Sequence, residues 1–180
     1  MEIKGSCYCG QVKYTAVSHT PYPYMRCYCS MCRKTAGGGG YSINIMAQAD
    51  TFKVEGEAHV AVHDSWTDDD EHPGKLKKSS VQGYYCRHCG SALWASDPAW
   101  PQWIYPYASA IDSELPKPPE LVHIMLDFAA SWVEVPRGEG HSHFNRYPDE
   151  SIEDWHRRHG LYQPNVTGDR PLFNHPGRLA

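Results

Sequence analysis

The segment MRCYCSMCRKTAGGGG, which runs from Met25 to Gly40, places three cysteines within six residues and ends in four consecutive glycines. Its cysteines are Cys27, Cys29 and Cys32. Three sulfurs this close in the chain cannot all form unstrained disulfides, but they can converge on one soft metal ion. We therefore interpret this segment as a metal-binding segment around which the rest of the chain is organised.

The other four cysteines form two pairs, Cys7 with Cys9 and Cys86 with Cys89. A structural zinc site is closed by four protein ligands, whereas a reactive one keeps three and leaves a position for water or substrate. An inventory of four plus three sulfurs therefore predicts two Zn²⁺ ions per chain, one structural and one catalytic. Spacing alone does not decide which pairs combine, since Cys7 and Cys9 could instead complete the central cluster.

The segment CRHCG, from Cys86 to Gly90, has the pattern of a zinc knuckle. A glycine after the second cysteine permits the positive φ that aims backbone N–H groups at the sulfurs. Such a turn, far along the chain from another cysteine pair, is a strong zinc signal. The alternatives are buried free thiols or a redox-active pair, for which Cys29 with Cys32 and Cys86 with Cys89 are the candidates.

The three-cysteine set has two interpretations. In the first, three thiolates hold zinc and the fourth position exchanges its ligand. In the second, the set is another structural site, closed by a histidine such as His88 or His123 or by water without turnover. The histidines of residues 141–143 and 156–159 are interpreted as ordinary surface polarity.

Basic residues and glycines surround the three cysteines. Arg26, Arg33 and Lys34 flank the sulfurs, and the glycines 37–40 can bring backbone N–H groups close to an anion. A small acidic thiol would suit such a place, because its sulfur could take the vacant zinc position while its carboxylates meet the basic groups. An exposed, solvated face is the alternative for Arg33 and Lys34.

Composition and charge limit the class of protein. A chain of 180 residues suits one domain, and 15 glycines and 14 prolines indicate many turns and short elements. A formal charge of −4 makes nucleic acid a poor partner. The first residues lack the apolar run of a signal peptide, and no later window offers a membrane span. We therefore expect a cytoplasmic protein, where clustered cysteines are more often metal ligands than disulfides.

Hydrophobic patterning predicts a β-rich meander with a short C-terminal helix. Apolar and polar residues alternate in several short segments, which are typical of strands with one buried face. These segments are residues 11–16, 41–45, 51–54, 59–62, 81–85, 91–94, 102–108 and 121–128. The capping box from Ser151 to Asp154 and the stop at Gly160 predict a helix, followed by a loose tail from about Gln163.

Three motifs together resemble one known family. They are GSCYCGQV at residues 5–12, CYCSMCRK at 27–34 and YCRHCGS at 85–91. In this order and spacing they are similar to the glutathione-dependent formaldehyde-activating enzyme family, which includes centromere protein V. The resemblance covers roughly residues 3–135. It departs at Thr35 and Ala36, where many relatives have a serine-glycine turn, and this leaves the identity of the substrate open.

The resemblance implies a fold of several coiled antiparallel sheets organised around zinc knuckles. It implies a closed zinc site on Cys7, Cys9, Cys86 and Cys89, and a reactive zinc on Cys27, Cys29 and Cys32. Residues 1–136 would form the zinc-binding domain, and residues 137–180 an extension. The implied activity is that of a carbon-sulfur lyase acting on a glutathione adduct of formaldehyde or another small aldehyde. The competing hypothesis is a non-catalytic, zinc-stabilised module that binds a thiol or a protein.

Overall fold

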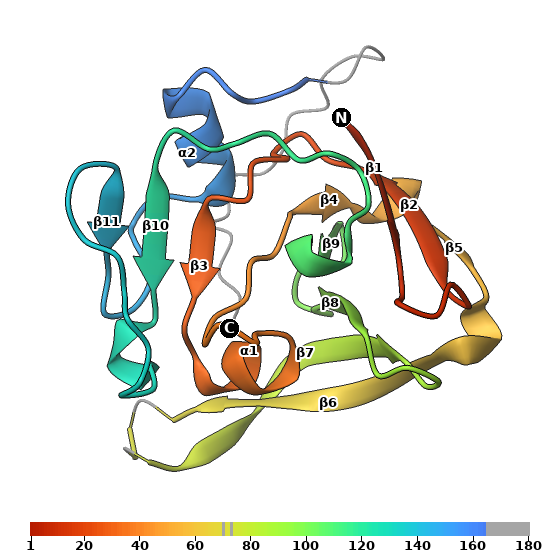
Figure 1. Cartoon of the computed structure of the whole chain (residues 1–180), viewed down its shortest axis with the longest axis horizontal. Coiled ribbons are helices and arrows are strands. Elements are labelled where there is room, and N and C mark those ends of the chain that lie inside the picture. The colour runs from red at the N-terminus through yellow and green to blue at the C-terminus, as the bar shows by residue number, and fades with distance from the viewer. Residues whose placement is uncertain (70, 73, 165–180) are drawn as a thin grey trace.

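The structure is a computed structural model that describes residues 1–69, 71–72 and 74–164. Strands dominate it, and they form three sheets (Figure 1). The first sheet has the order β1 (Glu2–Ser6), β2 (Lys13–Val17) and β5 (Lys53–Glu55). The second has the order β4 (Ala47–Gln48), β9 (Trp103–Pro106), β8 (Ala92–Ser96), β7 (Leu76–Cys86) and β6 (Val60–Asp68). Both are antiparallel, which confirms the predicted fold class.

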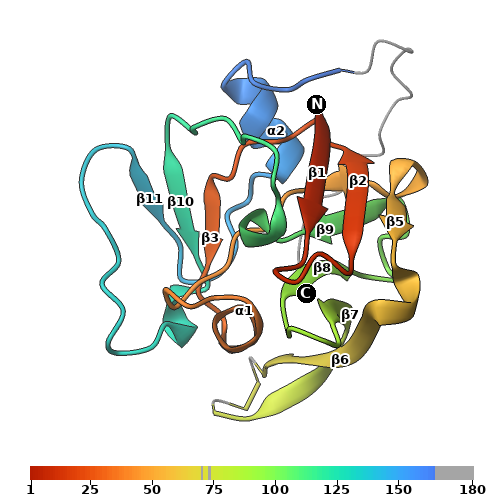
Figure 2. The ribbon, with the colours of Figure 1, turned by 45° about the vertical axis from the view of Figure 1, so that its right-hand side comes forward.

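The third sheet is parallel, a feature that the sequence did not predict. Its order is β11 (His141–His143), β10 (Leu121–Ile124) and β3 (Met25–Cys27). It lies beside the first sheet, as Figure 2 shows at the left and right of the view. Because β10 pairs with β3, the last residue of β3, Cys27, stands opposite Ile124 in the middle of the fold.

A tyrosine anchors the first sheet to the loop after β9. Tyr14 is buried, and its hydroxyl donates a hydrogen bond of 2.9 Å to the carbonyl oxygen of Ala110. Its ring lies directly over Gly5, where a Cβ atom would come within 2.2 Å of the ring. Glycine is therefore required at this position for steric reasons.

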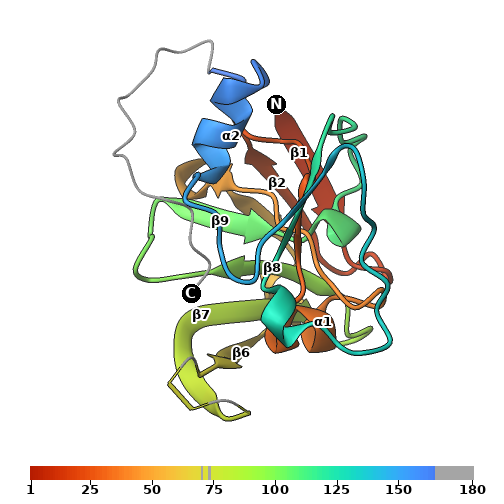
Figure 3. The same cartoon turned by 90° about the vertical axis from the view of Figure 1, so that its left-hand side faces the viewer.

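The hairpin of β6 and β7 extends below the fold and holds helix α1 (Ser30–Thr35) (Figure 3). Asp68, the last residue of β6, accepts hydrogen bonds from both the backbone N–H and the hydroxyl of Ser30, at 3.1 and 2.9 Å. The second sheet thus fixes the start of the helix that contains Cys32 and is capped by Cys29.

Two of the predicted strands differ from the structure. Residues 41–45 form isolated bridges to Cys27 and Tyr107 instead of a continuous strand. The predicted strand 121–128 ends at Ile124, because Met125 adopts a left-handed backbone with φ of 61° and a 3₁₀ turn (Leu126–Phe128) follows. Alternation of polar and apolar residues does not register such a change of backbone direction.

Helix α2 (Ile152–Arg158) begins as the capping box predicts, with the hydroxyl of Ser151 accepting from the Asp154 amide at 3.0 Å. Trp155 is buried and stacks on Tyr24 with ring centroids 3.7 Å apart. The extension therefore contributes to the core, and its β11 completes the third sheet. The domain division at residue 136 stays a prediction.

His156 contradicts the expectation of surface polarity, because it is fully buried on the inner side of α2. Its Nδ1 bonds to the carbonyl of Ile152 at 2.7 Å, and its Nε2 accepts from the backbone N–H of Tyr22 at 3.2 Å. The predicted loose tail falls mostly on residues 165–180, which lie outside the described residues. Gln163 itself donates its N–H to the carbonyl of His19.

In the described part of the chain, no helix combines the length and the apolar character that crossing a membrane requires.

Candidate metal centres

Four cysteines from two distant segments meet at one end of the second sheet. Cys7 and Cys9 follow β1, Cys86 ends β7, and Cys89 follows it within the next turn. Cys7 Sγ lies 3.5 Å from Cys9 Sγ, which lies 3.7 Å from Cys86 Sγ. Tetrahedral zinc with bonds of about 2.3 Å separates its sulfurs by about 3.8 Å, so the spacing fits such an ion.

Each half of this four-sulfur group closes with a backbone turn that ends at a glycine. Gly10 donates its N–H to the carbonyl of Cys7 at 2.9 Å, and Gly90 donates to Cys86 at 2.8 Å. Both glycines have φ of 74°, a conformation that L side chains rarely adopt. The amide of Val12 also donates to the sulfur of Cys7 at 3.2 Å, as expected for a ligand that carries negative charge.

Ser91 joins the two halves. Its hydroxyl accepts the N–H of Tyr8 at 3.0 Å and lies 3.2 Å from the sulfur of Cys89. This hydrogen bond lowers the pKa of the Cys89 thiol to about 5. Thiolates are the form that binds zinc, so the surroundings prepare this sulfur for a metal.

The remaining three sulfurs form a second group. Cys27 ends β3, Cys29 is the residue that caps α1, and Cys32 lies in the first turn of the helix. All three are buried, with exposed fractions of 3%, 5% and 2%. The sulfur of Cys29 accepts the N–H of Cys32 at 3.4 Å.

Hydrogen bonds among these thiols separate their pKa values. Bonds from Cys27 and Cys32 lower the pKa of Cys29 to about 3, and the contact with Cys29 raises that of Cys27. The group therefore favours a negative charge on Cys29. The backbone of Cys27 is held by a pair of hydrogen bonds with Ser42, of 2.9 and 3.0 Å.

The group of three contains no fourth histidine, cysteine or carboxylate ligand from the described residues. His88 bonds instead to His59 at 2.9 Å. The ring of His123 lies between the hydroxyl of Tyr28, at 2.9 Å, and His141, at 3.0 Å. Neither candidate histidine therefore closes the three-sulfur group in this structure.

The donor chemistry of both groups fits a soft divalent ion. All seven cysteines are free of disulfides, and the ligand atoms of each group lie within 4.8 Å of one another. Thiolate clusters of this kind are typical of zinc.

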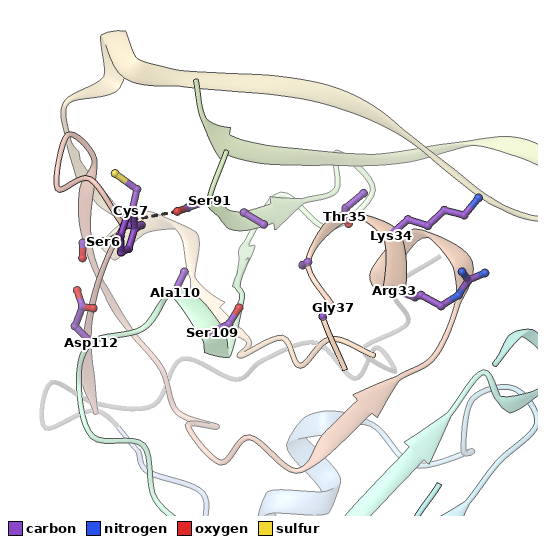
Figure 4. A pocket seen from close by; sticks show the side chains of 14 residues that line it. Ser6, Cys7, Arg33, Lys34, Thr35, Gly37, Ser91, Ser109, Ala110 and Asp112 are labelled. Atoms are coloured by element: carbon purple, nitrogen blue, oxygen red, sulfur yellow. Dashed lines mark hydrogen bonds between the residues drawn. The ribbon is translucent and has the colours of Figure 1, made fainter. Parts of the chain in front are cut away.

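The three basic candidates do not lie together. Arg26 belongs to β3, and its guanidinium lies 4.7 Å above the ring of Tyr41. Arg33 and Lys34 belong to the last turn of α1, and their charged ends point away from the neighbouring cavity (Figure 4). Both residues line the cavity, but not with their charged groups. A ligand could therefore meet these charges only at the rim of the cavity.

A cavity of about 700 Å³ lies between the end of α1 and the first cysteine turn. Ser6, Cys7 and Asp112 lie on one side of it, and Thr35 and Gly37 lie on the other (Figure 4). None of the three central cysteines lines it. Sequence reasoning missed Asp112, because this residue belongs to a loop without a motif and reaches the cavity only through folding.

Tyr107 is a second residue that sequence reasoning did not select. It is buried, and burial together with the nearby charge of Cys32 raises its pKa. Thr35, which lines the cavity, partly offsets this rise of the Tyr107 pKa. Tyr107 thus connects the wall of the cavity with the surroundings of the three sulfurs.

Comparison with known proteins identifies the family of this chain. The model of the glutathione-dependent formaldehyde-activating enzyme family matches residues 2–126, and the chain belongs to this family. A Halomonas elongata protein named "Putative glutathione-dependent formaldehyde-activating enzyme" is 50% identical over 161 residues, which cover 89% of this chain and 98% of that protein. A crystal structure of a Rhodobacter sphaeroides protein is similar with a TM-score of 0.44 and 20% identity, covering 63% of this chain and 91% of that one.

Proposed function

We propose that the protein is a zinc-dependent carbon-sulfur lyase that forms or breaks the adduct of glutathione, or a similar thiol, with formaldehyde or another small aldehyde. The observation that carries the proposal is the three-sulfur group, which has no fourth histidine, cysteine or carboxylate ligand among the described residues. A zinc site with three protein ligands keeps a position for substrate. Membership of the family and the name of the Halomonas relative support the same reaction.

In this proposal Cys27, Cys29 and Cys32 hold the catalytic zinc, and Cys7, Cys9, Cys86 and Cys89 hold a structural one. A zinc ion at the three sulfurs would stabilise the thiolate of a bound substrate near neutral pH, or would polarise the carbonyl oxygen of the aldehyde. In the reaction, the thiol sulfur bonds to the aldehyde carbon, and the proton of the thiol ends on the oxygen that becomes a hydroxyl.

The chain's own residues keep the three sulfurs in place. Ser42 fixes the backbone of Cys27, and Asp68 fixes the start of α1. Burial of the cysteines limits the access of water to the reacting atoms. We also assign the protein to the cytoplasm, where reduced thiols and glutathione are available.

The test is the rate at which glutathione and formaldehyde exchange with their adduct, measured by NMR exchange spectroscopy against the spontaneous rate. The protein should accelerate the exchange. Cys29→Ser should reduce the acceleration at least about a hundredfold, since it removes one zinc ligand. Circular dichroism and a retained structural zinc would show that the variant is folded. An unchanged rate in this variant would refute the proposal.

A non-catalytic binding module is the second candidate, and the burial of the three cysteines favours it, since the most exposed of them, Cys29, is only 5% exposed. It would bind thiol saturably without accelerating adduct formation. Calorimetric titration with glutathione beside the rate measurement separates the two candidates, because only the enzyme shows both binding and acceleration.

A further inference from the structure

Ser42 stands directly opposite Cys27, the first of the three central cysteines. The two residues form an isolated antiparallel bridge, in which each amide donates to the carbonyl oxygen of the other, at 2.9 and 3.0 Å. In such a pair both side chains project from the same face, with Cβ atoms about 5 Å apart. The hydroxyl of Ser42 therefore lies on the same side of the backbone as the sulfur of Cys27.

The neighbouring side chains agree with this orientation. Tyr28 follows Cys27 and Tyr41 precedes Ser42, so both tyrosines should project from the opposite face. Their rings do contact each other, with centroids 5.3 Å apart. The hydroxyl of Tyr28 forms its hydrogen bond with His123 on that side, at 2.9 Å. The sulfur of Cys27 and the hydroxyl of Ser42 thus share the other face.

The hydroxyl of Ser42 is a buried polar group without a partner. The residue is only 5% exposed, and its Oγ makes no hydrogen bond to any residue that the structure describes. Buried hydroxyl groups are almost always hydrogen-bonded, and a group that is not requires an explanation. A ligand that binds beside the three sulfurs would supply the partner.

The same hydroxyl lies near a second central sulfur. Contact with Cys27 lowers the pKa of the Cys32 thiol, contact with Cys29 and burial raise it, and the hydroxyl of Ser42 lowers it. A hydroxyl acts on a thiol in this way only at short range, although its orientation here makes no hydrogen bond. Because a serine hydroxyl is not among the usual zinc ligands, Ser42 borders the three-sulfur group without closing it.

We propose that Ser42 is a catalytic residue of the lyase and that its hydroxyl donates a hydrogen bond to the aldehyde oxygen. The inference rests on the function proposed above and adds a residue that the cysteine motifs do not contain. When the thiol sulfur bonds to the aldehyde carbon, one electron pair of the C=O bond moves to the oxygen. That oxygen then takes the proton that the thiol has lost, and Ser42 keeps its own. A fixed donor stabilises the charge where it develops.

Ser42→Ala tests the donor in zinc-saturated protein. Loss of one donor to a developing oxyanion should lower kcat for adduct exchange about a hundredfold, while KM for the thiol stays within about twofold. Ser42→Thr keeps a hydroxyl and should lose less than about tenfold. An unchanged kcat in Ser42→Ala, or equal losses in the two variants, would overturn the assignment.

Ser42→Cys tests the position of the side chain without measuring activity. It places a fourth sulfur beside Cys27 and Cys32, and four thiolates close a zinc site. The zinc of the three-sulfur group should then withstand a competing chelator at least about tenfold better. In cobalt-loaded protein the thiolate-to-metal absorption should increase by one thiolate per chain, whereas Ser42→Ala should leave it unchanged.

Ser18→Cys is the matched control for an added thiol. Ser18 is also buried, but its hydroxyl donates to the carbonyl of Met46 at 2.7 Å. This variant should leave both the zinc retention and the cobalt absorption unchanged. Equal results for Ser18→Cys and Ser42→Cys would overturn the placement of Ser42 beside the metal position.

These outcomes are separable from those of the proposed function. Acceleration that persists undiminished in Ser42→Ala would overturn the role of Ser42 and leave the lyase. A protein that shows no acceleration before any substitution would overturn the lyase and the catalytic role together.

Discussion

Single residues decide how closely the segments of this fold approach one another. Gly5 lies under the ring of Tyr14, and the hydroxyl of that tyrosine ties β2 to the loop at Ala110. A methyl group at residue 5 would collide with both the ring and the carbonyl oxygen of Ala110, at 2.2 and 2.3 Å. Neither neighbour is free to move without breaking the hydrogen bond between them.

Gly5→Ala should therefore destabilise the protein by about 3 kcal/mol, the upper range for overpacking a core. Gly38→Ala is the matched control, because a Cβ there meets open space, and it should change stability by less than about 0.5 kcal/mol. Urea unfolding of the zinc-loaded proteins measures both. Equal stability of the two variants would show that the contact with Tyr14 does not constrain the fold.

His156 makes stability depend on pH. Burial lowers its pKa to about 4, and its Nε2 accepts the N–H of Tyr22, which a protonated ring cannot do. In the unfolded chain a histidine titrates near about 6.5, so the unfolded state binds more protons between these values. Stability should fall as the pH drops from about 6.5 to 4, by about 2 kcal/mol at pH 5.

His156→Gln should remove this part of the pH dependence, although it lowers stability at every pH. The measurement compares the loss of unfolding free energy between pH 7.5 and 5 in the two proteins, both loaded with zinc. The loss should be about 2 kcal/mol smaller in the variant. The same loss in both proteins would mean that His156 does not carry the effect.

The sequence held a clue to this residue. Ile152 and His156 are four positions apart, so they lie on the same face of the helix, and Ile152 is apolar. The basic residues that follow His156 nevertheless favour an interpretation as surface polarity. The cysteine turns were easier to predict, because Gly10 and Gly90 each follow the second cysteine of a pair, and this local pattern is typical of zinc sites. Asp112 had no such signal, because its neighbours in the cavity come from distant segments.

At the scale of elements, the β6 and β7 hairpin positions the three-sulfur group through one side chain. Asp68 accepts both hydrogen bonds that Ser30 donates at the start of α1. Cys29 caps this helix and Cys32 lies in its first turn, so the position of the helix sets the positions of both sulfurs. A contact behind a metal ligand typically affects metal affinity by tenfold or more.

Asp68→Ala should therefore weaken zinc at the three-sulfur group about tenfold and leave the four-sulfur group unchanged. Asp64→Ala is the control on the same strand, because Asp64 is exposed and bonds only to Lys78 among the ion pairs of the described residues. The measurement is the number of zinc ions that each variant retains after competition with a chelator, which reports on both sites. Equal zinc retention in the two variants would contradict the proposed role of the hairpin.

Short elements explain most of what patterning missed. Strands β3 and β11 have three residues each and α1 has six, so none is long enough to display a period. The two strands also pair in parallel with β10, and parallel partners are joined by long connections that local sequence does not reveal. Helix α2 was predictable because its capping box and stop are local signals.

At the scale of the whole molecule, the C-terminal extension belongs to the same core as the cysteine segments. Trp155 is 1% exposed and packs in the cluster that also contains Cys27, Cys29 and Cys32. The resemblance to the family covered the chain to about residue 135, so it predicted the central fold but not the way in which α2 covers the third sheet.

Trp155→Ala should lower the free energy of unfolding by about 3–5 kcal/mol in a single transition of the whole protein. Trp132→Ala is the control, since that residue is 64% exposed and its loss should cost less than about 0.5 kcal/mol. Thermal unfolding monitored by near-UV circular dichroism detects both effects. If Trp155→Ala unfolds only helix α2 and leaves the unfolding temperature of the rest of the protein unchanged, the extension is an independent unit.

The central claim is that four cysteines hold one zinc ion and three hold another. It is tested most directly by counting the zinc ions per chain and identifying the fourth ligand of the second ion. An anomalous-scattering map at the zinc edge supplies both. It should show two ions, one bound by four cysteine sulfurs and one bound by Cys27, Cys29 and Cys32 with a fourth ligand from outside the protein. A fourth protein atom on the second ion, or an empty three-sulfur group in zinc-loaded protein, would contradict the proposal.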